Sequence, residues 1–190
     1  MNHDRRVHHA PLIRHIAAGD WPDITVLERG AYSRLGLSEG RAALEAKVSA
    51  SPTTCFALDL TGRLAGYLLA LPYPESAYPD LRGAEAAPAL PSRNLHLHDI
   101  VVAEDLRHQG LARLLLSHLT ATARHQGYER ISLVAVGGSE TFWSARGFTA
   151  GPVTPAGYGP TAVYMSRALP AGPAPRRESE KWADAGAPRA

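Results

Sequence analysis

Two histidines, His96 and His98, stand two residues apart in an apolar segment and suggest proton-transfer chemistry. If that segment is a strand, residues two apart project from one face, about 6.5 to 7 Å from each other along the chain. A free imidazole has a pKa of ~6.5, which makes it a competent base near neutral pH. The pair is therefore a candidate general base. Strict alternation places Asp99 on the opposite face, where we expect a structural hydrogen-bond acceptor.

A second candidate site is the segment 107–112, which reads Arg-His-Gln-Gly-Leu-Ala and lies between an apolar strand segment and a long amphipathic helix segment. Backbone N–H groups at a helix start have no intrahelical partner and lie at the positive end of the dipole, so they can hold a pyrophosphate. Gly110 and Ala112 leave that approach open. The segment lacks the Gly-Lys-Ser/Thr ending of a triphosphate-binding loop and the three-glycine spacing of a dinucleotide fingerprint. A nucleoside triphosphate and a nicotinamide cofactor are therefore disfavoured as ligands.

The elements that position these residues alternate between strands and helices. Strands are expected over 12–16, 53–60, 63–71, 95–102, 130–136 and 161–167. Helices are expected over 22–32, 38–48, 110–126 and 138–146, with Ser38 capping the second. A two-residue turn joins the second and third strands into a hairpin, and 95–136 forms a βαβ unit. The prediction is a single α/β domain with a central mixed sheet flanked by helices.

The motifs along residues 50 to 150 together resemble the GNAT family of N-acetyltransferases. Arg107-x-x-Gly110-x-Ala112 is similar to the Arg/Gln-x-x-Gly-x-Gly/Ala signature of that family. The strands before and after its helix, and Phe142-Trp143-x-x-x-Gly147-Phe148 beyond them, lie at the family's spacing. His-x-His before the cofactor strand looks like the paired histidines of the arylalkylamine (serotonin) N-acetyltransferase branch, where a water-linked pair is proposed to carry the amine proton outward.

The resemblance implies acetyl-CoA as co-substrate, with no metal, and a direct transfer of the acetyl group to a primary amine. Backbone groups of the strand would bind the pantetheine arm and the thioester, and amides of the following turn would hold the pyrophosphate. The implied cofactor-binding residues are Ile100, Val101, Val102, Arg107, His108, Gln109, Gly110, Leu111, Ala112, Arg113, Ser139 and Phe142. The Val101 or Val102 amide would stabilise the oxyanion.

The family's acid, a tyrosine that protonates the leaving thiolate, is replaced here by Trp143, whose indole donates a hydrogen bond but no proton. Tyr158 or Tyr164 could replace it, or the acid is dispensable because a thiol has a pKa of ~8.5. Trp143 would instead pack in the core or line the acyl pocket.

The loop 72–92 carries five prolines and is expected to lie over the site. Its aromatic residues Tyr73 and Tyr78 and its carboxylates Glu75 and Asp80 would suit a cationic organic amine, an arylalkylamine or a polyamine.

Composition limits the alternatives. The chain has 190 residues, 20 Lys and Arg against 18 Asp and Glu, and a single cysteine, Cys55. These numbers favour one domain over residues 11–169, a buried non-catalytic thiol, and no nucleic-acid partner. Polar tails over 1–10 and 170–190, and the lack of a long apolar run, predict a cytoplasmic protein that does not bind membranes. A homodimer is left open by the family resemblance.

Two other functions remain open from the sequence. The chain could bind acetyl-CoA without turnover, since the family tyrosine is missing. Alternatively, His96 and His98 could bind a metal ion, completed by His118, His125 or Asp99, although two histidines define no particular metal.

Overall fold

The computed structural model describes residues 10–81 and 91–170. The predicted tails fall almost entirely on residues 1–9 and 171–190, outside the described residues, as does 82–90 of the predicted loop. Along the chain the strands are β1 Leu12–His15, β2 Phe56–Leu60, β3 Arg63–Pro72, β4 Asn94–Val102, β5 Arg130–Ala135, β6 Thr149–Ala150 and β7 Val163–Ala168. The α-helices are α1 Trp21–Tyr32, α2 Arg41–Ala50, α3 Leu111–His125 and α4 Glu140–Ser144. Single 3-10 turns are η1 Ala18–Asp20, η2 Ser33–Leu35, η3 Pro52–Thr54 and η4 Glu104–Leu106.

The seven strands form one mixed sheet in the order β1-β2-β3-β4-β5-β7-β6. Only β4 and β5 pair in parallel, because α3 carries the chain between them, while all other neighbours are antiparallel. This architecture confirms the predicted α/β domain with a mixed sheet. The short strand β6 was not predicted, since two residues carry no readable alternation.

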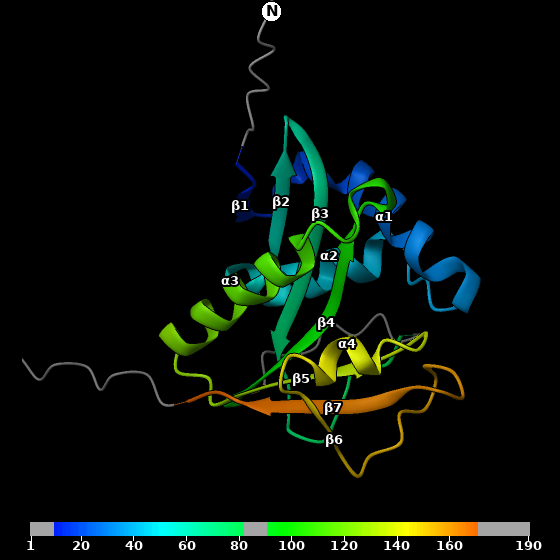
Figure 1. The fold of residues 1–190 in the computed structure, drawn as a ribbon, viewed down its shortest axis with the longest axis vertical. Helices are drawn as coiled ribbons and strands as arrows, with labels where there is room; N and C mark the ends of the chain where they lie inside the picture. Colours follow the sequence, from blue (N-terminus) through cyan, green and yellow to red (C-terminus); the bar gives the residue numbers. More distant parts are fainter. Residues whose placement is uncertain (1–9, 82–90, 171–190) are drawn as a thin grey trace, which may run out of the picture.

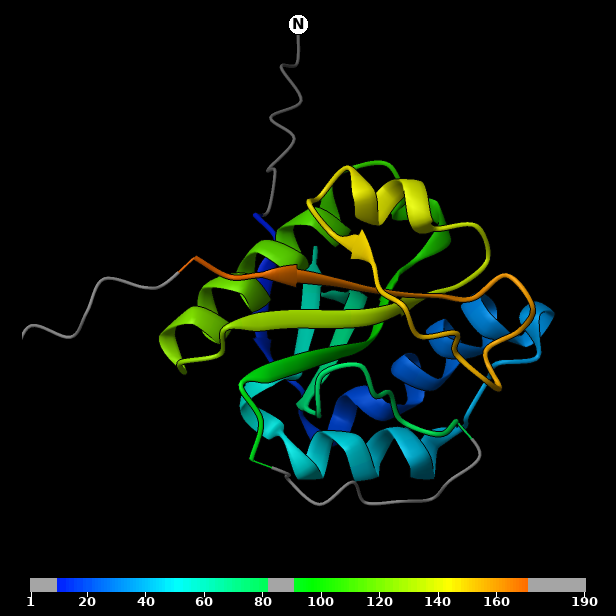
Figure 2. The same ribbon diagram turned by 90° about the horizontal axis from the view of Figure 1, so that it is seen from below.

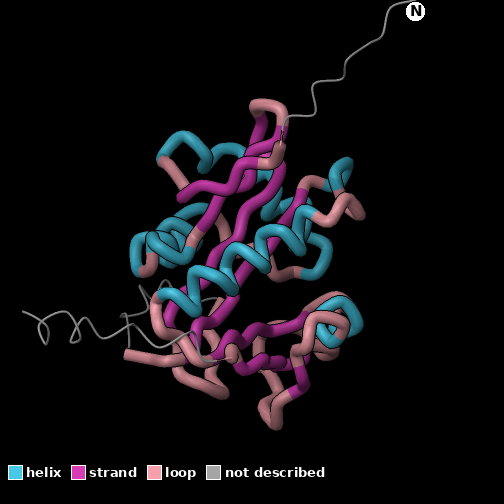
Figure 3. Tube along the Cα trace, turned by 60° about the vertical axis from the view of Figure 1, so that its left-hand side comes forward, coloured by secondary structure: helices cyan, strands magenta, loops and turns pink. Residues whose placement is uncertain are grey.

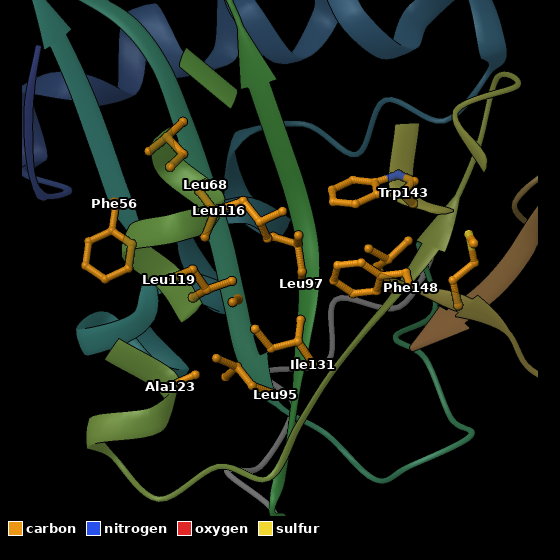
Figure 4. Packing of buried hydrophobic residues seen from close by; sticks show 14 of the residues in the cluster. Phe56, Leu68, Leu95, Leu97, Leu116, Leu119, Ala123, Ile131, Trp143 and Phe148 are labelled. Carbon is orange, nitrogen blue, oxygen red and sulfur yellow. The ribbon is translucent and has the colours of Figure 1, made fainter. Parts of the chain in front are cut away.

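Helices cover both faces of the sheet, with α3 and α4 on one face and α1 and α2 on the other (Figure 2). On the side of the sheet that α3 covers, the apolar stripe of this helix is buried. Its residues Leu115 and Leu119 belong to the same hydrophobic cluster as Leu97 of β4. Trp143 of α4 and Phe148 continue that cluster beyond Leu97 (Figure 4). Each fully buried leucine of this kind stabilises the fold by about 1.5–3 kcal/mol, so this core fixes α3 firmly against the strands.

The sheet opens between β4 and β5. Their pairing runs from Asn94 opposite Arg130 to Leu97 opposite Leu133 and ends there, although β4 continues to Val102. Beyond this point β4 stays with β2 and β3, while β5 and β7 run across the molecule in another direction (Figures 1 and 3). The far half of β4 therefore has no strand partner on its β5 side among the described residues.

A β-bulge in β4 changes the predicted orientation of Asp99. Leu69 of β3 lies opposite Asp99 and Ala70 lies opposite Leu97, so His98 is the extra residue. A bulge shifts the alternation of every side chain after it by one residue. Asp99 consequently points to the α1 and α2 face, the face of His96 and His98, and the expectation that it lies opposite the histidines is wrong.

The second predicted helix also starts later than the sequence suggested. Its N-cap is Gly40, and the Ser38 hydroxyl instead donates a hydrogen bond to Glu28 Oε2 at 2.7 Å. The prediction of Ser38 as N-cap is therefore wrong, because the helix begins at Arg41 and Ser38 lies in the connection before it. None of the helices in the described ranges has both the length and the apolar content to span a membrane.

Candidate active site

The start of α3 presents free backbone donors. Gly110 is the N-cap with φ +81°, a left-handed conformation that glycine adopts without strain, and a Cβ at this position would meet no atom within 4 Å. The first backbone bond of the helix joins the Leu114 amide to the Gly110 carbonyl at 3.0 Å. The amides of residues 111–113 precede that bond, so they have no partner within the helix and can bind an anion.

These donors face a cavity of 660 Å³ between β4, the 106–113 turn and α4. Its lining includes every residue of the predicted Arg107 to Arg113 segment, together with Val102, Leu106, Phe142 and Arg146. Arg146 was not predicted. Its guanidinium lies 3.4 Å from the centre of the Phe142 ring and donates to the Phe142 carbonyl at 2.5 Å, so it is held at the cavity wall.

A neighbouring groove of 380 Å³ along α3 makes this region strongly basic. Four arginines line it, Arg113, Arg124, Arg146 and Arg167, together with the hydroxyl-bearing Ser117 and Thr120. In the described part of the chain none of the four has a carboxylate partner. Burial, and to a smaller extent the charge of Arg113, lowers the pKa of Arg146. An anion is the complementary ligand for such a surface.

A second cavity, of 390 Å³, occupies the opening between β4 and β5. It shares Arg107, Ala112 and Phe142 with the first cavity, so the two cavities adjoin. Its other lining residues come from α1, η2, β4, β5, α4 and the connection between β5 and α4, and those with polar or aromatic side chains are Tyr32, His98, Asp99, Ser139 and Trp143. The two adjoining cavities together extend from the helix start to His98.

His98 reaches this cavity with one ring nitrogen already engaged. Its Nε2 lies 2.5 Å from Glu39 Oε1, and the second carboxylate oxygen of Glu39 accepts from Lys47 Nζ at 2.5 Å. The side chains of His98, Glu39 and Lys47 are only 2%, 5% and 4% exposed. The His98 Nδ1 atom is buried with no hydrogen-bond partner in the described structure.

His96 has a different environment. It is fully buried, its Nδ1 lies 3.1 Å from the Ser132 hydroxyl, and its ring centre lies 6.1 Å from that of Tyr73 and 6.3 Å from that of His98. Burial, with a smaller contribution from His98, lowers the pKa of His96 to about 3. His96 is therefore neutral at all ordinary pH values and does not line the cavity.

Asp99 lies at the α1 side of the cavity and accepts hydrogen bonds from two phenols. Tyr32 Oη donates to Oδ1 at 2.5 Å, and Tyr67 Oη donates to Oδ2. Burial raises the pKa of Asp99, while the two tyrosines oppose that shift. The predicted role as a structural acceptor agrees with these two bonds.

Trp143, at the position of the family's acid, and the two tyrosines that could replace that acid have different surroundings. Trp143 packs edge-on against Phe142 and Phe148 and also lines the second cavity. The Tyr164 hydroxyl accepts from the Ser76 amide at 2.9 Å and is not in the lining of either cavity. Tyr158 donates to the Pro79 carbonyl at 2.7 Å, and burial raises its pKa.

The predicted substrate loop is held down by contacts of its own. Glu75 pairs with Arg130 of β5 at 2.9 Å, and Tyr78 packs edge-on against Tyr158 with ring centres 5.6 Å apart. Tyr73 stands beside His96. The loop therefore borders the buried histidine, whereas the cavity itself is closed by Tyr32 and Leu35 from the α1 region.

Several residues of the site gave no signal in the sequence. Glu39 and His98 are 59 positions apart, and Tyr32 and Asp99 are 67 apart, so only the packing of α1 and α2 on the sheet joins them. Arg146 lies just before the Gly147-Phe148 part of the recognised motif, and its charge beside a phosphate-binding turn could have been noticed.

The geometry also bears on the metal-binding alternative and on the environment of Cys55. Among residues 10–81 and 91–170, no group of three or more His, Cys, Asp or Glu could hold a metal ion. His118 packs edge-on against Phe56, with ring centres 4.6 Å apart. Cys55 is buried, and burial raises its pKa to about 12, so its thiol is a poor nucleophile.

Comparison with known proteins places the chain in a family. The sequence profile described as the acetyltransferase (GNAT) family matches residues 21–148. The chain therefore belongs to the GNAT acetyltransferase family. No protein with a curated description matches the sequence significantly.

Solved structures share the fold over nearly their whole length. The ribosomal-protein-S18-alanine N-acetyltransferase from Escherichia coli matches with a TM-score of 0.64 and 17% identity, covering 87% of this chain and 97% of that one. The PaiA N-acetyltransferase from Thermoplasma acidophilum, in complex with coenzyme A, matches with a TM-score of 0.64 and 11% identity, covering 84% and 99%. The GNAT-like decarboxylase GphF, in complex with isobutyryl-CoA, matches with a TM-score of 0.70 and 21% identity, covering 84% of this chain and 100% of that one.

At these identities the structural likeness shows the fold alone. Two of the three proteins are named for N-acetyl transfer and one for decarboxylation, so one fold carries different reactions. The reaction of this chain must be argued from its own residues.

Proposed function

We propose that this chain is an N-acetyltransferase that transfers the acetyl group of acetyl-CoA directly to a primary amine of a small molecule. The observation that carries the proposal is the pair of adjoining cavities that extends from the α3 start to His98. A phosphate-binding helix start at one end and a proton acceptor at the other are the two parts that acyl transfer from a thioester to an amine requires.

The residues present fit coenzyme A. The free amides of residues 111–113 and the guanidinium groups of Arg107, Arg113 and Arg146 would hold its phosphates, and Ser139 and Phe142 would border the pantetheine arm. When bound, acetyl-CoA supplies an activated acyl group and a thiolate leaving group.

The edge of β4 would bind the arm and the thioester carbonyl. The Ala103 amide donates to the Ala65 carbonyl of β3 at 2.9 Å. Because successive peptide groups of a strand point to opposite sides, the Val101 amide is also directed to β3, and the Val102 amide is directed into the opening. We therefore prefer the Val102 amide to that of Val101 as the oxyanion donor, with Ile100 next along the same open edge.

His98 would act as the general base. As the amine nitrogen forms its bond to the acyl carbon, its proton moves to the imidazole, and the carbon–sulfur bond breaks. Neutral, buried His96 would keep the His98 ring in place rather than carry a proton itself. No side chain need protonate the thiolate, because a thiol with a pKa of ~8.5 leaves readily as its anion.

The amine is proposed to carry an apolar or aromatic body, as in an arylalkylamine. Tyr32, Phe142 and Trp143 line the cavity around His98, and Asp99 and Glu39 provide negative charge beside it. Aromatic walls with a nearby carboxylate suit an organic ammonium ion. A polyamine is the second small amine that this charge would suit.

A screen of small primary amines, aminoglycosides and peptides with acetyl-CoA, followed by release of free thiol, tests the proposal. We expect release that depends on one class of small amine and falls about 100-fold or more in His98→Gln. Tight binding of acetyl-CoA with no amine-dependent release from the folded protein would instead indicate a non-catalytic acetyl-CoA-binding domain.

A further inference from the structure

The buried contact between Glu39, His98 and Lys47 goes beyond the role of His98 as the base in the proposed function. Glu39 lies in the connection between η2 and α2, His98 on β4 and Lys47 on α2. The connection that carries Glu39 is itself fixed by Glu28 of α1, which accepts from the Ser38 hydroxyl and from the Glu39 amide, each at 2.7 Å. Three elements therefore hold the Glu39 carboxylate in one position.

The contact fixes which nitrogen of His98 carries the proton. An ionised carboxylate only accepts hydrogen bonds, so the ring nitrogen 2.5 Å from Glu39 Oε1 must be a donor. Burial alone would raise the pKa of Glu39, but the hydrogen bond and charge of His98 and the charge of Lys47 lower it, and the carboxylate is ionised at neutral pH. Neutral His98 thus has its hydrogen on Nε2 and its lone pair on Nδ1.

The Nδ1 atom is the one with no partner in the described structure, and His98 belongs to the lining of the cavity between β4 and β5. A carboxylate on one ring nitrogen and a free lone pair on the other, at a cavity wall, is the arrangement of a carboxylate–histidine base. A buried histidine nitrogen without a partner destabilises the fold, and a role in binding a substrate proton explains its persistence.

We propose that Glu39 is a positioning residue that holds His98 in the Nε2–H tautomer, so that Nδ1 accepts the proton of the attacking amine, with Lys47 fixing the second carboxylate oxygen. This inference rests on the proposed acetyl transfer. The amine loses one proton to Nδ1 as its bond to the acyl carbon forms, the electron pair of the broken carbon–sulfur bond leaves on sulfur, and His98 becomes an imidazolium. The imidazolium then returns its proton to solvent.

The surrounding charges favour that imidazolium. The titratable and charged groups around His98 are His96 and Asp99 from β4, Glu28 and Tyr32 from α1, Glu39, Lys47 from α2, Tyr67 from β3, Tyr158 from the loop before β7, and Arg107 at the cavity wall. Of the charged groups in this set, the three carboxylates of Asp99, Glu28 and Glu39 outnumber the two cations, Lys47 and Arg107. A positive charge formed on the ring is therefore stabilised electrostatically.

The first test reads the tautomer directly in the free wild-type protein. Nitrogen-15 NMR of labelled imidazoles distinguishes a protonated from an unprotonated ring nitrogen, and the His98 signals are assigned by their loss in His98→Gln. We expect a protonated Nε2 and an unprotonated Nδ1. A wild-type His98 with its proton on Nδ1 would overturn the proposal, and this reading needs neither a substrate nor a Glu39 variant.

The second test uses Glu39→Gln with Glu45→Gln as the matched control, since Glu45 is on the surface of α2 and its ion pair in the described structure is with the neighbouring Arg41. The side-chain amide introduced by Glu39→Gln can donate to Nε2, which would move the ring proton to Nδ1. We expect kcat/KM to fall about 100-fold, the acid limb of its pH profile to move to lower pH, and the Kd for coenzyme A to stay within about twofold. Glu39→Asp should recover part of the rate.

Unchanged kcat/KM and pH profile in Glu39→Gln, with the control behaving alike, would show a merely structural ion pair and overturn the proposal. If no amine releases thiol with the wild-type protein, the proposed function fails, and the NMR reading alone decides whether Glu39 sets the tautomer. The two failures are therefore distinguishable.

Discussion

Gly66 of β3 lies directly opposite Val102 of β4, and a Cβ at Gly66 would stand 2.5 Å from the Val101 carbonyl oxygen and 3.3 Å from the Val102 Cα. Such a contact with backbone cannot be relieved by rotating a side chain. The absence of a side chain at Gly66 therefore allows β3 to approach the part of β4 whose other edge is open.

Gly66→Ala should push β4 towards the opening and damage the site there. We expect a loss of about 1–3 kcal/mol in the free energy of unfolding, measured by urea denaturation, and weaker binding of coenzyme A by calorimetry. Gly30→Ala is the control, because its Cβ would meet nothing within 4 Å on α1 and should be neutral or slightly stabilising. Equal effects of the two substitutions would argue against this account of Gly66.

The basic residues beside the α3 start should contribute to binding through charge. Arg113→Gln and Arg146→Gln are each expected to raise the Kd for coenzyme A about 3- to 10-fold at low salt and to reduce its salt dependence, because each removes one cation from the cavity wall. Arg29→Gln, exposed on α1, should leave both quantities unchanged. A Kd insensitive to Arg113 and Arg146 would place the phosphates elsewhere.

Neither Trp143 nor Tyr164 should act as a proton donor. Trp143→Phe is expected to reduce stability by about 1–3 kcal/mol through lost packing, with kcat retained within about threefold. Tyr164→Phe removes the hydrogen bond from the Ser76 amide, at a loss of about 1 kcal/mol, and should likewise keep its kcat. A large fall of kcat in Tyr164→Phe, together with a changed basic limb of the pH profile, would restore Tyr164 as the acid.

Burial of neutral His96 should make stability depend on pH. Its pKa is about 3 in the folded protein and ~6.5 in an unfolded chain, so between these values only the unfolded state binds the proton. The contribution of neutral His96 to the free energy of unfolding is complete above pH ~6.5. It is lost as the pH falls towards about 3, by up to about 1.4 kcal/mol per pH unit. Denaturant titrations at several pH values should show this dependence of the free energy of unfolding on pH in the wild type and not in His96→Gln. The control His125→Gln, at an exposed position, should keep the wild-type slope. Parallel plots of the free energy of unfolding against pH for wild type and His96→Gln would contradict the burial of neutral His96.

The sequence was sufficient for the order of the main elements and for the helix start at Gly110, because these depend on local signals. Alternation of apolar residues defines β4 and β5, and glycine with unpaired amides defines the turn into α3. The orientation of Asp99 was not predictable, since the bulge at His98 arises only from pairing with β3.

The partners of the histidines could not be predicted for the same reason. Glu39 comes from a connection whose path is fixed by Glu28, and His96 is buried by Tyr73 and by Ser132 of β5. Two histidines that look equivalent in sequence thus differ in the structure. Only His98 combines a buried carboxylate partner with a place on the cavity wall.

The most direct measurement is a calorimetric titration of coenzyme A into the purified, folded chain. The account predicts saturable binding at one site per chain with a Kd of about 1–100 µM, since substrates of such enzymes commonly have KM values in the micromolar range. No binding at millimolar coenzyme A, with circular dichroism showing the protein folded, would contradict the claim that the α3 start and the opening between β4 and β5 form a coenzyme A site.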